Sequence, residues 1–155
     1  MKRRFLIPFA VSVAAALAAI QLVPYGRAQM NPPVVREPAW DSADTRTLAK
    51  QACFDCHSNE TEWPAYARVA PASWLIQWDV SEGRAALNFS EWHKPQKEAD
   101  EASEKVAEGD MPLFAYTLAH AHARLTHAQR AQLARGLAKT LGGSREAGEH
   151  DEDRH

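Results

Sequence analysis

The sequence has few cysteines: Cys53 and Cys56 are the only two among its 155 residues, and His57 follows the second one directly. A structural zinc site built on a Cys-x-x-Cys pair needs a second pair of ligands at a defined spacing. The chain has no other cysteine, and His120 and His122 lie more than sixty residues further on. The shortage of cysteine therefore argues against a structural zinc site.

The patterns typical of β-strands are also missing. No segment shows a sustained alternation of apolar and polar residues with many β-branched side chains, and the sequence contains no internal repeat. Helical spacing of apolar residues instead predicts helices at about 44–52, 71–87, 96–109 and 126–142. The sequence also offers end signals for these helices: Asp44 and Thr45 can cap the first, Gly109 ends the third, and Thr126 and Gln129 form a capping-box pattern before the last, which carries Leu133, Leu137 and Leu141 at helical spacing. We therefore expect a small all-α domain.

Acidic residues are absent from the first thirty positions, and all twenty of them lie after Met30. That part of the chain carries fourteen Lys and Arg residues against the twenty acids, a net charge of −6. Proteins that bind nucleic acids need a basic surface for the phosphates. The charge distribution therefore excludes nucleic acid as an expected partner.

The N-terminal region has a basic start, Met1–Arg4, followed by nineteen uncharged residues at 5–23. A secretory signal has an apolar core of about 7–15 residues, whereas about 17–25 residues are needed to span a bilayer. The run therefore predicts either an N-terminal anchor in the inner membrane or a signal that is cleaved near Ala28. In both cases the rest of the chain is expected on the periplasmic side.

Composition divides the chain into four expected regions. Residues 1–30 form the anchor or signal segment, and the Pro-rich residues 31–39 form an extended spacer that holds the domain away from the membrane. The helical domain is expected at 40–142, where Gly142 ends the last helix. Residues 143–155 are charged and polar, and we expect them to be a disordered tail.

The two cysteines and the histidine together predict covalent attachment of one haem c. A redox dithiol of the thioredoxin type is expected at the start of a helix within a βαβ unit, but here the motif follows a helix. In the haem interpretation, Cys53 and Cys56 add to the two vinyl groups of the porphyrin, and His57 becomes the proximal iron ligand. A single disulfide is the simpler alternative, but it leaves the adjacent histidine unexplained.

Two residues are candidates for the second axial position of the iron. Met111 precedes Pro112, which disfavours helical geometry at Met111 and places it in a loop from which its soft sulfur can reach iron. Alternatively, Met111 fills a gap in the core. His120 is the second candidate and would lower the reduction potential relative to a methionine ligand.

Several other side chains are candidates for the walls of a haem crevice. Arg68 and Arg84 are candidates for pairing with haem propionates, although an exposed arginine is more often simply solvated. His93 and His127 are expected at the surface. Four tryptophans can wall a crevice or simply pack in the core: Trp63, Trp74, Trp78 and Trp92.

Two longer stretches carry a resemblance to a known family. The text CFDCHSNETEWPAYARVAPASWLIQWDVSEGRAALNFSEW, followed by GDMPLFAYTLAHAHARLT, resembles the haem-binding domain family of cytochrome c-like proteins from bacteria. The resemblance covers roughly Asn31 to Leu141. It implies an exported or membrane-anchored monohaem domain with a cytochrome c-like helical fold.

The resemblance also implies roles for individual residues. Cys53 and Cys56 correspond to the haem attachment points, and His57 corresponds to the proximal ligand. The Met-Pro pair and the later histidine of the family correspond to Met111 and His120, so the resemblance leaves both candidates open.

Three functions are compatible with these residues. The first is a periplasmic electron carrier with a six-coordinate haem and no enzymatic activity, whose redox partners the sequence does not identify. The second is a sensor or peroxidase-like protein with a five-coordinate iron that binds a gas or peroxide. The third is an interaction module in which the haem is a covalent staple for a small core.

Overall fold

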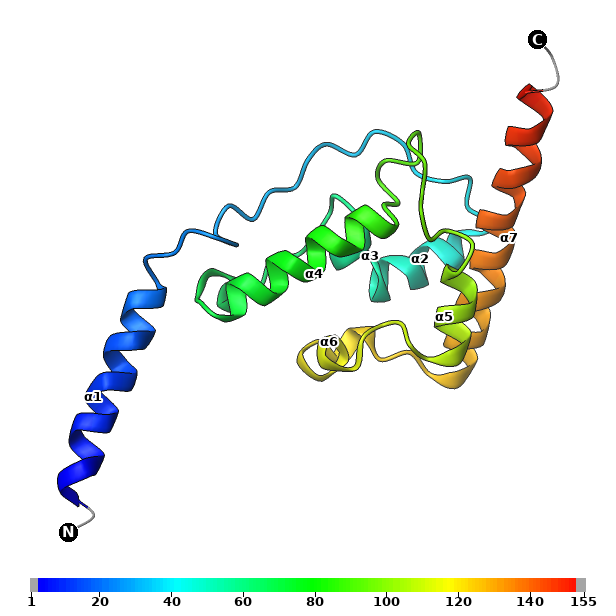
Figure 1. Cartoon of the computed structure of the whole chain (residues 1–155). Coiled ribbons are helices and arrows are strands. Elements are labelled where there is room, and N and C mark those ends of the chain that lie inside the picture. Colours follow the sequence, from blue (N-terminus) through cyan, green and yellow to red (C-terminus); the bar gives the residue numbers. More distant parts are fainter. Residues whose placement is uncertain (1–2, 153–155) are drawn as a thin grey trace. The chain divides into compact units, whose positions relative to one another are not determined.

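A computed structural model of the protein describes the backbone of residues 3–152 and the side chains of residues 6–142. The described backbone contains helical segments and one isolated bridge between Arg36 and Glu91, but no strand (Figure 1). The prediction of an all-α fold is therefore confirmed for this part of the chain.

The chain forms two compact units that are discontinuous in sequence. The first unit comprises the residues up to 30 together with 62–81, and the second comprises 31–61 together with the residues from 82 onward. Helix α4 (Ala72–Ala86) belongs to the first unit up to Ser81 and to the second unit after it. The expected domain limits at 40 and 142 stay a prediction.

The first unit contains α1 (Arg3–Ile20), the 3-10 helix η1 (Ala65–Arg68) and the beginning of α4. Hydrogen bonds join its two sequence segments. The Gln21 side chain donates to the carbonyl oxygen of Ala70 over 2.9 Å and accepts from the Ala70 backbone N–H over 3.0 Å. These bonds connect the end of α1 to the turn that precedes α4.

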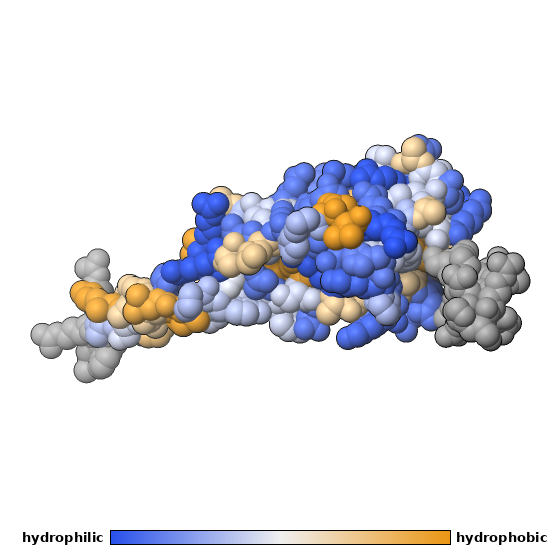
Figure 2. All heavy atoms as spheres, turned by 90° about the horizontal axis from the view of Figure 1, so that it is seen from above, coloured by the Kyte–Doolittle hydropathy of each residue, from blue (hydrophilic) through white to orange (hydrophobic). Residues whose placement is uncertain are grey.

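The apolar N-terminal run is exposed along much of its length. Figure 2 shows hydrophobic residues gathered over α1, and Ile7 and Phe9 are 71% and 69% exposed. None of the helices that the structure describes is both long enough and apolar enough to cross a membrane. The anchor helix expected at residues 5–23 is therefore not supported.

Helix α4 confirms the helix predicted at about 71–87, but the apolar residues on one of its faces are largely exposed. Leu75 and Trp78, which lie on one helical face with Trp74, are 59% and 56% exposed. Ser73 and Val80 are buried instead. The helical spacing of the apolar residues therefore predicted the helix correctly but did not predict which of its faces is buried.

The second unit contains the remaining helices. Its first helix begins after Ser42, whose Oγ accepts a hydrogen bond from the backbone N–H of Thr45 over 3.2 Å, so Ser42 is the N-cap. Asp44 and Thr45, which the sequence predicted as capping residues, lie within the helix instead. The helices of the unit are α2 (Ala43–Ala52), α3 (Phe54–His57), α5 (Ala102–Glu108), α6 (Phe114–Ala119), η2 (Ala121–Ala123) and α7 (His127–Glu152).

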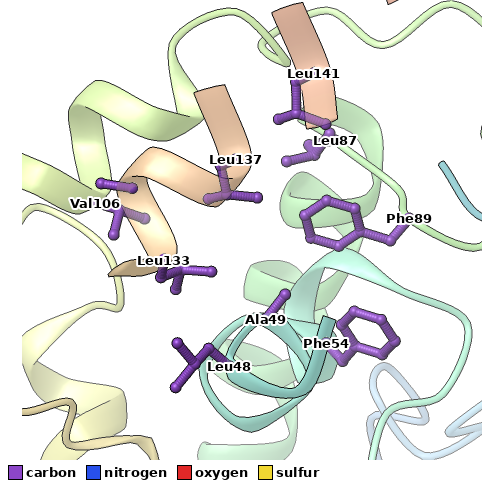
Figure 3. Close-up of a cluster of buried hydrophobic side chains, with 10 residues drawn as sticks. Leu48, Ala49, Phe54, Leu87, Phe89, Val106, Leu133, Leu137 and Leu141 are labelled. Carbon is purple, nitrogen blue, oxygen red and sulfur yellow. The ribbon is translucent and has the colours of Figure 1, made fainter. Parts of the chain in front are cut away.

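The core of this unit lies where α7 packs against α2 and α5 (Figure 3). Leu133, Leu137 and Leu141 on α7 are 0%, 1% and 6% exposed, and this spacing of four residues places them on one face, as predicted. Burying a leucine side chain stabilises a fold by about 1.5–3 kcal/mol. Val106 of α5 and Ala49 of α2 are buried in the same cluster.

Two predicted helix boundaries are confirmed by their capping geometry. Helix α5 ends at Gly109, which adopts a left-handed conformation with φ of 92°. Before α7, the Thr126 backbone N–H donates to Gln129 Oε1 over 2.9 Å, and the Gln129 N–H donates to Thr126 Oγ1 over 3.2 Å. This reciprocal pair is the capping box that the sequence predicted.

The predicted end of the last helix is wrong. Helix α7 continues past Gly142 to Glu152. A glycine inside a helix costs only about 1 kcal/mol relative to alanine, so it does not by itself end a helix. The side chains of 143–152, and residues 153–155 entirely, lie outside the described part. The disordered tail expected at 143–155 therefore stays a prediction.

The Pro-rich segment 31–39 is extended, as expected, but it is not a free spacer. The backbone N–H groups of Val35 and Arg36 donate to the Ser90 carbonyl oxygen over 2.9 and 3.1 Å. The Trp92 N–H donates to the Arg36 carbonyl oxygen over 2.9 Å. The segment is therefore part of the second unit, because neighbouring backbone satisfies its polar groups.

Candidate functional site

The Cys-x-x-Cys-His motif begins where α2 ends. Cys53 is the C-cap of α2, and its backbone N–H donates to the Ala49 carbonyl oxygen over 2.8 Å. The short helix α3 follows and contains Cys56 and His57, and the His57 N–H donates to the Cys53 carbonyl oxygen over 2.9 Å. The motif therefore follows a helix, as the sequence predicted, and the two cysteines form no disulfide.

The imidazole of His57 has a defined orientation. Its Nδ1 lies 2.9 Å from the carbonyl oxygen of Gly83 and 3.1 Å from that of Leu87. Carbonyl oxygens only accept hydrogen bonds, so Nδ1 carries the hydrogen and Nε2 has the free lone pair. Burial lowers the pKa of His57, while the two carbonyls partly offset this effect, so the ring is neutral at neutral pH. A neutral imidazole held in this way is suited to bind a metal through Nε2.

Gly83 allows the last turns of α4 to lie close to the motif. A Cβ atom at this position would lie 2.5 Å from the Cys56 carbonyl oxygen and 3.0 Å from the Cys56 Cβ. The absence of a side chain therefore brings the Gly83 carbonyl within reach of His57. Sequence analysis did not identify Gly83 or Leu87, because their contribution is a backbone oxygen. A glycine inside a predicted helix was the available signal.

The environment of Cys53 does not favour thiolate chemistry. Burial, with a smaller contribution from Cys56, raises the pKa of Cys53 to about 12. Redox-active dithiols and zinc ligands need a thiolate, and reactive cysteines have a lowered pKa. Addition to a vinyl group needs the sulfur and its hydrogen together, and a protonated thiol supplies both. The raised pKa thus argues against the redox dithiol.

A largely apolar cavity lies beside the motif and brings together three of the predicted site residues. Cys53 and His57 line it from the motif, and Met111 lines it from the loop between α5 and α6. The other lining residues are Ala52, Ala86, Leu87, Phe89, Glu98, Ala102, Lys105, Val106, Pro112 and Leu137. All of them belong to the second unit.

Met111 lies outside helical structure, as its position before Pro112 predicted. Its backbone N–H donates to the Lys105 carbonyl oxygen over 3.1 Å, which attaches the loop to the last turn of α5. The residue is half-buried and packs against the core cluster. Met111 therefore packs against the core and also lines the cavity that His57 lines. This position is compatible with both the core-packing and the ligand interpretations.

His120 occupies a different environment. It is the C-cap of α6 and stacks on Tyr116 with ring centroids 4.2 Å apart, and its Nδ1 lies 3.1 Å from the Tyr116 carbonyl oxygen. The Tyr116 hydroxyl in turn donates to Asp55 Oδ2 over 2.6 Å. His120 is not among the residues that line the cavity.

Asp55 and Tyr116 are site residues that sequence analysis missed. Asp55 lies between the two cysteines, and Tyr116 lies five residues after Met111. Burial and the neighbouring Asp55 carboxylate raise the pKa of Tyr116, so its hydroxyl stays protonated and remains a donor. The sequence gave no signal for this pair because the partners are 61 residues apart.

The expected tryptophans and arginines do not line the cavity. None of the four expected tryptophans lines the cavity, and Trp92 instead stacks on Phe89 with ring centroids 6.3 Å apart. Arg68 Nε donates to Gln29 Oε1 over 3.3 Å within the first unit. Arg84 Nε donates to the Ser58 carbonyl oxygen over 2.8 Å, directly after the motif.

Buried polar residues fix the chain that follows the motif. The Asn59 backbone N–H donates to Ser90 Oγ over 2.9 Å, and the Asn88 side chain donates to Asn59 Oδ1 over 3.0 Å. The Phe89 N–H donates to the His57 carbonyl oxygen over 2.8 Å. Because buried polar groups are costly unless they are paired, this network holds one arrangement of His57 relative to α4.

The residues present fit a covalently attached haem better than a metal ion held by side chains alone. Within the part of the chain that the structure describes, no group of three His, Cys, Asp or Glu side chains converges. One neutral imidazole, one thiol and one thioether line the largely apolar cavity instead, and the second thiol belongs to the adjacent α3. This donor set suits a ring that attaches through carbon and whose metal needs only axial ligands.

The close contact at Gly83 leads to a prediction about stability. Gly83→Ala places a methyl group against the backbone of Cys56, and overpacking of this kind costs about 1–3 kcal/mol of unfolding free energy. Gly142→Ala is the matched control, because it also adds a methyl group to a glycine in a helix but meets nothing within 4 Å. Urea unfolding of both variants measures the difference. Equal stabilities would contradict the proposed close approach of α4 to the motif.

Comparison with known proteins identifies the family. Residues 15–139, about four fifths of the chain, match the family described as Haem-binding domain. No curated protein and no solved structure matches the chain. The matched region contains the whole motif together with Met111, and Cys53, His57 and Met111 line one cavity in the structure. The chain therefore belongs to the haem-binding domain family.

Proposed function

We propose that this protein is a c-type monohaem electron carrier, with haem attached through Cys53 and Cys56 and with His57 and Met111 as the axial ligands. The observation that carries the proposal is the cavity lined by Cys53, His57 and Met111, in which the tautomer of His57 leaves Nε2 available. Membership of the haem-binding domain family supports haem as the cofactor.

The two cysteines provide the covalent attachment in this proposal. Each protonated thiol adds across one vinyl double bond, so that its sulfur bonds to one carbon and its hydrogen goes to the other. The raised pKa of Cys53 keeps that hydrogen in place. Two thioether bonds then hold the cofactor even where non-covalent contacts are few.

Met111 is favoured over His120 as the second axial ligand by the positions of the two residues. Met111 lines the same cavity as His57, whereas His120 stacks on Tyr116 and does not line it. A thioether also suits a protein that carries electrons, because methionine raises the reduction potential relative to a second histidine.

The haem supplies a one-electron couple, and the protein residues around it set its ligation and exclude external ligands. With both axial positions filled by the protein, a gas or peroxide has no site at the iron. The walls of the cavity include the apolar side chains of Phe89, Val106 and Leu137. An electron carrier needs no catalytic base, so we propose no enzymatic activity.

We further propose that the protein is exported to the periplasm. The basic Met1–Arg4 start and the apolar 5–23 run support a secretory signal, with cleavage near Ala28. Periplasmic redox proteins are the proposed partners.

The first prediction concerns the covalent bonds. After maturation in a periplasm that is competent for c-type haem, the polypeptide mass should include one haem, and haem staining should persist after denaturing electrophoresis. Cys53→Ala and Cys56→Ala each leave at most one thioether, so both should stain weakly and accumulate poorly. A wild-type mass without haem would exclude covalent attachment.

The second prediction concerns the axial ligand. Met111→Ala should open the site, so that the ferric spectrum shifts toward high spin and the ferrous protein binds carbon monoxide. His120→Ala is the control and should leave the spectrum unchanged. If His120→Ala opens the iron instead, ligation by two histidines is correct. If the unmutated ferrous protein binds carbon monoxide readily, the five-coordinate sensor or peroxidase function replaces the electron carrier.

The third prediction concerns export. A reporter that is active only in the periplasm, fused after His155, should be active, and deletion of 5–23 should abolish its activity. Activity of a cytoplasm-specific reporter at the same position would contradict export.

A further inference from the structure

The segment that begins at Met111 and contains α6 has little hydrophobic attachment. None of the six residues of α6 is buried, and Phe114 and Leu118 are 75% and 60% exposed. A helix this short is not stable by itself in water and is normally held by an apolar face packed on the core. Another kind of contact must therefore hold α6.

The far end of the segment is anchored by packing. In η2, Ala123 is fully buried, and η2 packs against α2. Arg124 Nε donates to the Thr117 carbonyl oxygen over 2.7 Å, and Arg124 Nη2 donates to that of Leu118 over 3.2 Å, which connects the end of α6 to the residues after η2. These contacts fix the C-terminal side of the segment. At its start, the Met111 backbone N–H donates to the Lys105 carbonyl oxygen over 3.1 Å, which leaves the residues between Met111 and the end of α6 to be held by other contacts.

The side next to Met111 is connected to the haem attachment motif by one short hydrogen bond. Tyr116 Oη donates to Asp55 Oδ2 over 2.6 Å, and Asp55 lies in α3 between Cys53 and Cys56. Hydrogen bonds to a charged acceptor are about twice as strong as neutral ones. The stacking of Tyr116 on His120 holds the phenol ring in place for this bond.

We propose that Tyr116 is a positioning residue whose hydrogen bond to Asp55 keeps Met111 on the wall of the cavity. The inference rests on the proposed role of Met111 as axial ligand. Met111 lies five residues before Tyr116, so the bond joins the methionine loop directly to the helix that carries the proximal histidine. When the bond breaks, the loop moves away and the iron position opposite His57 becomes accessible.

The test compares Tyr116→Phe with Thr117→Val in the full, haem-loaded protein. Tyr116→Phe removes only the hydroxyl that donates to Asp55. Thr117→Val removes a neighbouring hydroxyl whose hydrogen bond, 2.9 Å to the Phe114 carbonyl oxygen, stays within α6. Two measurements follow: carbon monoxide binding to the ferrous protein, and hydrogen exchange of the amides at 113–123.

Tyr116→Phe should raise the apparent affinity for carbon monoxide and the rate of exchange at 113–123 by about 10-fold or more, the change expected from losing a hydrogen bond to a charged group. Thr117→Val should change neither. The urea midpoint for unfolding of the whole protein should stay close to that of the wild type, whereas a general structural role would lower it. Asp55→Asn keeps an acceptor and should have a smaller effect, which gives a second variant if Tyr116→Phe accumulates poorly.

The outcomes separate this inference from the proposed function. If Met111→Ala opens the iron but Tyr116→Phe changes neither measurement, the positioning role is wrong and the electron-carrier function stands. If Met111→Ala leaves the spectrum unchanged, the ligand assignment fails, and faster exchange in Tyr116→Phe then shows a structural bond that positions no ligand. Both results overturn the inference.

Discussion

The site depends on one interaction: the hydrogen bonds from His57 Nδ1 to the carbonyl oxygens of Gly83 and Leu87. The Gly83 carbonyl also accepts from the Leu87 backbone N–H over 2.9 Å, so the imidazole is a second donor at the end of α4. The helix C-terminus carries partial negative charge, which makes the ring a better electron donor at Nε2. The two hydrogen bonds of Nδ1 thus fix the tautomer of His57 and the position of its ring relative to the end of α4.

Other features of the second unit preserve this contact. Gly83 permits the close approach of α4, and Phe89 returns a backbone hydrogen bond to His57. The ring of Phe89 also stacks on that of Phe54 at a centroid distance of 5.6 Å, so the aromatic core and the motif share residues. A change in the packing of Phe54 is therefore expected to move the histidine as well.

The sequence was sufficient to predict features that depend on local chemistry. The helix end at Gly109 and the Thr126–Gln129 capping box were predictable because each depends on residues that are close in the sequence. The family was predictable because its motifs are continuous stretches of sequence. The non-helical position of Met111 followed from the adjacent Pro112. By contrast, the acceptors for His57 are backbone atoms 26 and 30 residues away, and no side-chain pattern encodes a backbone acceptor.

The attachment of the Pro-rich segment has a consequence for the length of the mature chain. Asn31 Nδ2 donates to the Thr61 carbonyl oxygen over 2.9 Å, and Val35 and Arg36 are bonded to Ser90. An aminopeptidase binds substrates as free extended strands and cannot use backbone that is already paired. Trimming from a terminus created near Ala28 should therefore stop at about residue 31. Under the proposed cleavage near Ala28, the fold itself would set the N-terminus of the exported protein, within a few residues, whatever the position of the first cut.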